Sequence, residues 1–131
     1  MTQDIKKILH VEDDASLQRL VRIALEQIGD YAVLTAPDGE QALALVRDTV
    51  PDLVLLDLDL PGMNGIAVLR AMRDAARLRD VPVVFLTAAT DPQLLGQITS
   101  LGVTEVLIKP FRPRLLVETI DRVLGRKKDG A

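Results

Sequence analysis

Acidic side chains stand at two places in this sequence where a short apolar run ends. Glu12, Asp13 and Asp14 follow the run ILHV, and Asp57 and Asp59 come at the end of LVLLDLD. Carboxylates that converge repel one another and raise each other's pKa, and a divalent cation relieves that repulsion. Oxygen ligands without histidine or cysteine favour Mg²⁺. A carboxylate beside Mg²⁺ can attack phosphorus to form an acyl phosphate. The acids therefore predict Mg²⁺-dependent phosphoryl chemistry.

Two further polar residues end apolar runs and are suited to the same chemistry. Thr87 follows VVFL, and Lys109 follows EVLI. Phosphoryl oxygens need hydrogen-bond donors or a positive charge, which a hydroxyl and an ammonium provide. The alternative for any single residue is a helix cap or a turn. That alternative is favoured for Asp14, because it directly precedes an amphipathic run.

Composition narrows the class of protein. The chain has 131 residues, 48% of them hydrophobic and 27% charged, which is typical of one globular domain. It has no cysteine, and His10 is its one histidine, so thiolate catalysis and cysteine-based zinc sites are excluded. The net charge of −3 argues against binding nucleic acid. The longest uncharged stretch, residues 92–104, is shorter than the roughly 18 residues of a membrane span. We expect a cytoplasmic protein with no membrane contact.

The elements that must position these residues alternate strictly along the chain. Apolar runs predict strands over residues 5–11, 31–36, 52–58, 81–87 and 105–108, and helical periodicity predicts helices over 17–28, 39–50, 66–76, 92–101 and 115–124. This pattern predicts an α/β fold with a doubly wound, five-stranded parallel sheet. Ligands bind beyond the carboxyl ends of the strands in such sheets. We expect one domain over residues 1–124 and a flexible polar tail over 125–131.

Four motifs in order carry a resemblance to a known family. The runs ILHVEDD, LVLLDLDLPGMNG, VVFLTA and IKPF resemble those of the receiver domain of bacterial two-component response regulators. The resemblance covers about residues 5–124, and the chain is similar in length to the single-domain, chemotaxis-type members. It implies a (βα)5 flavodoxin-like fold with strand order 2-1-3-4-5.

The resemblance also implies a role for each acid. Asp57 matches the phosphorylated aspartate, and an acidic pair on the first strand holds Mg²⁺ together with Asp57. The pair could be Glu12 with Asp13 or Asp13 with Asp14. We choose Glu12 and Asp13, because this leaves Asp14 free to start the helix. The backbone carbonyl of Asp59 completes the protein's share of the metal shell.

The remaining site residues include one departure from the family pattern. Thr87 matches the switch hydroxyl, and Lys109 matches the lysine that pairs with the phosphoryl group. The family has a cis bond between that lysine and the next residue, here Pro110. Three residues before the lysine the family most often has tyrosine or phenylalanine, whereas this chain has Val106. The side chain of Asp59 is a further addition, either facing solvent or adding charge at the mouth of the site.

The resemblance implies a signalling function rather than a conventional enzyme. The phosphoryl group comes from a phosphohistidine on a sensor histidine kinase or a histidine phosphotransfer protein in a phosphorelay. The domain catalyses its own phosphorylation and its slow dephosphorylation. The first helix, near residues 15–22, is the expected docking face. The fourth helix, fifth strand and fifth helix address a downstream protein. We expect no direct contact with nucleic acid, and a monomer or weak dimer.

Two alternatives come from other classes of protein. A haloacid-dehalogenase-like, Mg²⁺-dependent phosphohydrolase also uses an aspartate, one residue and a second aspartate, which Asp57 and Asp59 satisfy. That family has its nucleophile on the first strand and its acidic pair after the lysine, whereas no paired carboxylates follow Lys109 here, and Glu118 and Asp121 are separated. An interaction module with an inactive site is disfavoured, because every residue needed for chemistry is present.

Overall fold

The central feature of the fold is one parallel sheet. The computed structural model describes residues 5–60, 62–88 and 92–126, apart from the side chain of Leu94. The sheet has five parallel strands in the order β2-β1-β3-β4-β5, which confirms the expected topology. The strands are β1 (Lys7–Val11), β2 (Ala32–Ala36), β3 (Leu53–Asp57), β4 (Val83–Thr87) and β5 (Glu105–Ile108).

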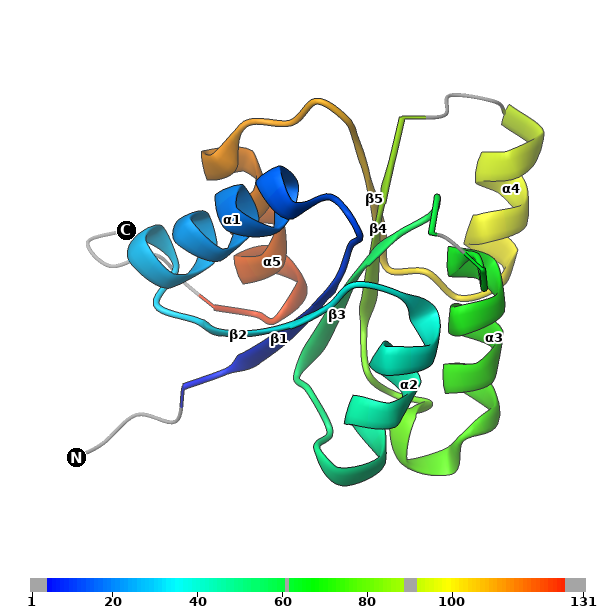
Figure 1. Cartoon of the computed structure of the whole chain (residues 1–131). Helices are drawn as coiled ribbons and strands as arrows, with labels where there is room; N and C mark the ends of the chain where they lie inside the picture. The colour runs from blue at the N-terminus through cyan, green and yellow to red at the C-terminus, as the bar shows by residue number, and fades with distance from the viewer. Residues whose placement is uncertain (1–4, 61, 89–91, 127–131) are drawn as a thin grey trace.

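Helices cover both faces of the sheet (Figure 1). They are α1 (Ala15–Ile23), α2 (Gly39–Asp48), α3 (Gly65–Asp74), α4 (Pro92–Ser100) and α5 (Pro113–Val123). Helices α1 and α5 lie on one face, and α2, α3 and α4 lie on the other. This arrangement buries every residue of β3 and β4. It explains why those two strands are apolar almost without interruption.

The structure shifts several element boundaries by one or two residues and divides the first expected helix. The first helix begins at Ala15, and its expected last turns form a π-helical segment, η1 (Ala24–Ile28), in which the Gly29 amide reaches back five residues to a carbonyl oxygen. Strand β4 begins at Val83 rather than at residue 81. Helix α5 begins two residues earlier than expected, because Pro113 suits a first helical turn, where its missing N–H needs no partner. A short 3₁₀ turn, η2 (Ala76–Leu78), follows α3.

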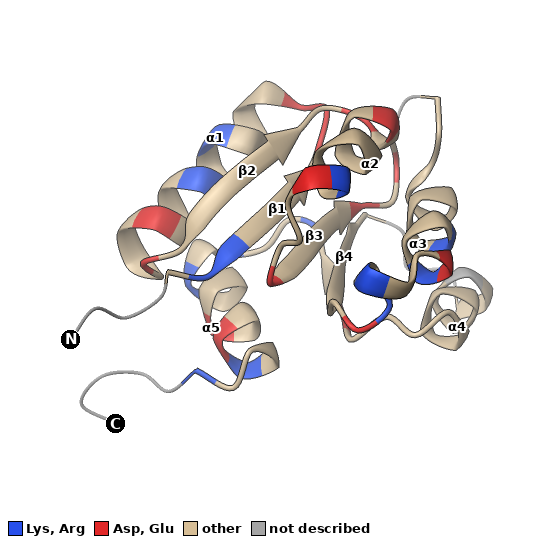
Figure 2. Ribbon diagram, turned by 90° about the horizontal axis from the view of Figure 1, so that it is seen from below, with Lys and Arg blue, Asp and Glu red and all other residues tan. Residues whose placement is uncertain are grey.

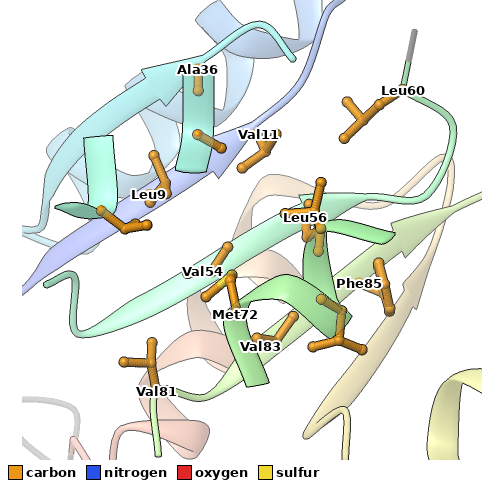
Figure 3. Close-up of a cluster of buried hydrophobic side chains, with 14 of the residues drawn as sticks. Leu9, Val11, Ala36, Val54, Leu56, Leu60, Met72, Val81, Val83 and Phe85 are labelled. Carbon is orange, nitrogen blue, oxygen red and sulfur yellow. The ribbon is translucent and has the colours of Figure 1, made fainter. Parts of the chain in front are cut away.

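Aliphatic side chains form two buried clusters, one on each face of the sheet. Figure 3 shows the cluster on the side of α2 and α3, where Val54, Leu56, Val83 and Phe85 from the central strands meet Met72 of α3. The second cluster joins the other face of the sheet to α1, η1 and α5. Each cluster anchors helices whose loops run across the carboxyl edge of the sheet, so packing holds that edge in a definite shape.

The end of α5 is tied to the opposite edge of the sheet. The hydroxyl of Tyr31, just before β2, donates to Asp121 Oδ1 at 2.5 Å, and the Arg126 guanidinium lies 4.6 Å from the centre of the Tyr31 ring. Burial, followed by the hydrogen bond to Asp121, raises the pKa of Tyr31 to about 12. Arg126 therefore makes specific contacts, and the other residues of the expected tail after it, 127–131, lie outside the described residues. Within the described part, no helix is long and apolar enough to cross a membrane.

Candidate active site

The carboxyl edge of the sheet gathers the acids of two neighbouring strands. Val11 and Leu56 are register partners in β1 and β3, so Glu12 and Asp57 come one residue later on adjacent strands. The Glu12 amide extends the pairing by donating to the Ala36 carbonyl at 2.9 Å. Figure 2 shows red ribbon where β1 passes into α1. Parallel pairing in register therefore brings together residues that lie 45 positions apart in the sequence.

Asp57 is a buried carboxylate at the carboxyl edge of the sheet, where Glu12 is also buried. It ends β3 and is only 2% exposed. Its Oδ1 accepts a hydrogen bond from the Asp59 amide at 3.1 Å, and its Oδ2 accepts one from Lys109 Nζ at 3.0 Å. A buried carboxylate needs such partners. Both oxygens are thereby held in fixed directions at the end of the strand.

Glu12 is buried beside Asp57, and its charge is disfavoured there. Burial, followed by the neighbouring Asp57 carboxylate, raises the pKa of Glu12 from 4.5 to about 7. Its Oε2 accepts from the Asp14 amide at 3.2 Å, whereas Oε1 has no hydrogen-bond partner among the described residues. Lys109 Nζ lies 3.5 Å from that Oε1.

Asp13 completes a cluster of three carboxylates. Oxygen atoms of Glu12, Asp13 and Asp57 all lie within 4.8 Å of one another. Asp13 is exposed and thus faces the solvent side of the cluster, whereas the other two are buried. Asp14 instead caps α1, because its Oδ1 accepts from the Leu17 amide at 3.0 Å. This geometry favours Glu12 with Asp13 over Asp13 with Asp14 as the metal-binding pair.

The donor set fits a hard divalent cation. The cluster supplies carboxylate oxygens alone, and one buried oxygen, Glu12 Oε1, lacks a hydrogen bond. A cation beside these atoms would relieve the repulsion that raises the pKa of Glu12. Such ligands match the preference of Mg²⁺ for one or two carboxylates with waters and phosphate oxygens.

Lys109 is the cation of the site. Burial opposes its charge, but the hydrogen bond and attraction of Asp57, with the attraction of Glu12, outweigh burial and raise the pKa of Lys109. Its ammonium stays charged and bridges the two buried acids. The Lys109–Pro110 peptide bond is cis, as the resemblance implied. The Lys109 amide donates to the Thr87 carbonyl at 2.8 Å, which continues the pairing of β5 with β4.

Thr87 and Asp59 take positions different from those of the clustered acids. Thr87 ends β4 and is fully buried, and its neighbour Ala88 lines the hollow at the site. Asp59 is exposed, and the described contact to Asp57 comes from its backbone amide. Its side chain is outside the cluster of three carboxylates, so the structure favours the solvent-facing alternative for this residue.

A hollow of about 700 Å³ opens above the acids. One side is formed by Asp57, Lys109 and the acids that follow β1, and the other side is formed by α1 and the residues after the cis bond. The lining residues are Glu12, Asp13, Asp14, Ser16, Leu17, Leu20, Asp57, Ala88, Lys109, Pro110 and Phe111. The hollow is open to solvent on one side, so a group carried by another molecule can reach Asp57.

Three residues that support the site were not found by sequence reasoning. Gly65 begins α3, and a Cβ there would lie 2.6 Å from the Asp57 carbonyl oxygen, so only glycine allows this approach. Gln18 Nε2 donates to the Glu12 carbonyl at 2.5 Å. His10 is fully buried beside Glu12, and neither of its ring nitrogens has a hydrogen-bond partner among the described residues. Of these three residues, only Gly65 had a signal in the sequence, because it directly follows Asn64, the residue that caps α3.

Comparisons with known proteins agree with this arrangement. The family model described as "Response regulator receiver domain" matches residues 8–121. The chain is 46% identical over 125 residues to the DNA-binding response regulator MtrA of Mycobacterium tuberculosis, covering 95% of this chain and 53% of that protein. It is 38% identical to the phosphate regulon transcriptional regulatory protein PhoB of Pseudomonas aeruginosa, covering 95% and 54%. The chain thus spans about half the length of these relatives.

Solved structures match over nearly their whole length. The chemotaxis protein CheY4 of Vibrio cholerae has a TM-score of 0.86 and 33% identity, covering 92% of this chain and 99% of that chain. The receiver domain of the sensor histidine kinase PA1611 of Pseudomonas aeruginosa has a TM-score of 0.84 and 30% identity, covering 93% and 99%. That structure has a magnesium ion coordinated in its active-site cleft.

These matches give no support to the phosphohydrolase alternative. Glu118 and Asp121 also lie in the wrong place for it. Asp121 accepts the hydrogen bond of Tyr31 at the opposite edge of the sheet, and Glu118 is exposed on α5. The order of the motifs and the positions of these acids in the structure therefore both argue against the phosphohydrolase alternative.

Proposed function

The chain belongs to the response regulator receiver domains of two-component signalling, and on that premise we propose that Asp57 accepts the phosphoryl group. The observation that carries the proposal is the placement of Asp57. It is buried at the end of β3, it shares a cluster with two other carboxylates, and it accepts a hydrogen bond from Lys109. The bond that forms joins a carboxylate oxygen to phosphorus, and the bond that breaks joins phosphorus to a nitrogen of phosphohistidine.

Glu12, Asp13 and Asp57 would hold Mg²⁺, with the Asp59 carbonyl as a further ligand. When bound, the ion neutralises carboxylate charge and stabilises charge on the phosphoryl oxygens. The relative with magnesium in its cleft and the donor set of this chain support the assignment. The side chains of Glu12 and Asp57 are already oriented by the Asp14 and Asp59 amides, so little reorganisation is needed.

Lys109 and Thr87 would divide the response to phosphorylation between them. A phosphoryl group adds about −1.5 to −2 charges and three acceptor oxygens. The Lys109 ammonium, 3.0 Å from Asp57 Oδ2, is placed to pair with that charge. The Thr87 hydroxyl lies at the end of the adjacent strand and would turn towards the new acceptors. Self-phosphorylation by small phosphodonors and slow dephosphorylation follow from the same groups.

The output surface would be α4, β5 and α5, with α4 as the element that moves. Val106 is half-buried in β5 and has one stiff side-chain torsion, so it cannot sweep out the volume of an aromatic ring. Helix α4 has no charged residue, and Gly96 in its middle is exposed with open space around it. Glycine weakens a helix interior by about 1 kcal/mol relative to alanine. A weak helix can reorder for a small input of free energy.

The partner that supplies the phosphoryl group would dock on α1. Leu20 and Ile23 are exposed there at 42% and 53%, and Leu20 also lines the hollow. Arg19 and Arg22 are exposed on the same helix, which appears as blue bands on α1 in Figure 2. The partner would be a sensor histidine kinase or a histidine phosphotransfer protein in a cytoplasmic phosphorelay. We place the domain at residues 1–124.

Intact-mass measurement tests the phosphoacceptor. The protein is incubated with Mg²⁺ and acetyl phosphate, and we expect one added phosphoryl group in the wild type and none in Asp57→Asn. Asp48→Asn is the matched control, because Asp48 is exposed at the end of α2, away from the site. Equal labelling of the wild type and Asp57→Asn would overturn the proposal. Steady turnover of phosphate esters by the wild type would instead revive the phosphohydrolase alternative.

A further inference from the structure

His10 is a polar side chain in a place where an apolar one would pack without penalty. It lies in β1 between Leu9 and Val11, which point into the α2–α3 cluster, so its ring is on the opposite face, under α1 and α5. It is 0% exposed, and neither ring nitrogen has a hydrogen-bond partner among the described residues. Leaving buried polar atoms unpaired is costly. The imidazole therefore needs an explanation beyond packing.

The ring faces an oxygen that also lacks a hydrogen bond. His10 Nε2 lies 3.9 Å from Glu12 Oε1, and both side chains are buried, at 0% and 1% exposed. The Glu12 Oε2 is already occupied by the Asp14 amide. Lys109 approaches Oε1 at 3.5 Å, but its hydrogen bond goes to Asp57 at 3.0 Å. An approach of less than 1 Å would join a donor and an acceptor that are otherwise unpaired.

The imidazole can make this contact without adding charge. A neutral imidazole has one N–H donor and one acceptor nitrogen. A proton on Nε2 would give Glu12 a donor that stays on the interior side when Lys109 turns to a phosphoryl group. The ring would then fix the carboxylate and leave the charge balance of the site unchanged.

We propose that His10 is a positioning residue for the magnesium site, holding Glu12 in place through a hydrogen bond from Nε2 to Oε1. The inference rests on the proposed function, because it assumes that Glu12 is a metal ligand. Groups behind metal ligands orient them, and losing such a group typically costs about 10–100-fold in metal affinity. We expect the lower end of that range, about tenfold, since the Asp14 amide still holds the other oxygen.

Three substitutions at this position separate the hydrogen bond from packing. The side-chain nitrogen of His10→Gln can reach the position of Nε2, whereas that of His10→Asn reaches only the position of Nδ1. His10→Leu fills similar space with no donor. Magnesium affinity is measured by calorimetry on the full chain, and urea unfolding in EDTA monitors the fold. We expect His10→Leu to be at least as stable as the wild type and yet to bind Mg²⁺ about tenfold more weakly. His10→Asn should match it, and His10→Gln should stay within about twofold of the wild type.

Nuclear magnetic resonance reads the same hydrogen bond directly, because His10 is the chain's one histidine. In ¹⁵N-labelled protein we expect the tautomer with the proton on Nε2, and a change of that proton's resonance in Glu12→Gln and on adding Mg²⁺. A proton on Nδ1, or wild-type Mg²⁺ affinity in His10→Leu, would overturn the inference alone. Absence of Mg²⁺ binding by the wild type would overturn the proposed function together with it.

Discussion

Replacing Glu12 with glutamine should stabilise the metal-free protein, by an amount that grows as the pH rises and is complete above neutral pH. The folded state raises the pKa of Glu12 from 4.5 to about 7, chiefly by burial. Between these two values the native protein keeps a proton that the unfolded chain gives up, so stability falls as the pH rises through this window. Above pH 7 the carboxylate is charged in both states, and the full destabilisation is present. Glutamine has the same shape and no charge.

The size of the pKa shift of Glu12 sets the size of this stability difference. At 1.36 kcal/mol per pH unit, it corresponds to about 3 kcal/mol in the free energy of unfolding. We therefore expect Glu12→Gln to be about 3 kcal/mol more stable than the wild type at pH 8, and only about 1 kcal/mol more stable at pH 5. The pKa shift can be converted into free energy without a reduction for solvent screening, because the Glu12 side chain is only 1% exposed.

Urea unfolding in EDTA at several pH values between 5 and 8 measures this difference. Glu40→Gln is the control, since Glu40 is exposed in the first turn of α2, and its effect should be small and constant. In Mg²⁺ at about a thousand times the dissociation constant the wild type gains about 4 kcal/mol, so the order should reverse in its favour. An equal difference at pH 5 and pH 8, or a loss of stability at pH 8, would refute the reasoning.

Three further predictions test other parts of the molecule. Lys109→Ala should lose both phosphorylation and response, whereas Thr87→Ala should still be phosphorylated and respond weakly; intact mass gives the first readout, and amide hydrogen exchange with beryllofluoride gives the second. Failure of Thr87→Ala to accept phosphate would contradict this division. Gly96→Ala should stabilise α4 by about 1 kcal/mol and reduce the beryllofluoride-induced change in exchange over residues 92–104; an unchanged response would place the moving element elsewhere. Tyr31→Phe removes the hydrogen bond to Asp121 and should cost about 1 kcal/mol in urea, with Mg²⁺ affinity unaffected, because the bond lies at the opposite edge of the sheet.

Local pattern was sufficient to predict the fold class of this chain. Strict alternation of apolar runs with amphipathic ones is sufficient to predict parallel strands with helical crossovers, because only that arrangement buries both kinds of element. The cap at Asp14 followed from local chemistry as well, and its Oδ1 accepts from the Leu17 amide, three residues on. The strand order itself came from the resemblance, and the structure has the same order.

The ends of elements were less predictable, because they depend on neighbours in space. The last turns of the first helix widen into a π-helix, so that the Tyr31 amide can reach the Leu25 carbonyl at 2.9 Å and lead into β2. The contacts of Arg126 likewise depend on Asp121 and on Tyr31. Tyr31 is distant from both of these residues in the sequence. Periodicity in a single segment has no information on such partners.

By itself, the sequence determined which residues stand at the carboxyl ends of the strands, and therefore which chemistry the site can perform. Tertiary structure alone decided how those residues are arranged around the site. The choice between Glu12 and Asp14 depended on which side chain turns inwards and which caps α1. The closeness of Gly65 to Asp57 and of His10 to Glu12 became visible only with the packed layers in place. The physical reason is that hydrogen bonds and repulsion act over a few ångströms, and only packing brings strands from distant parts of the chain within that range.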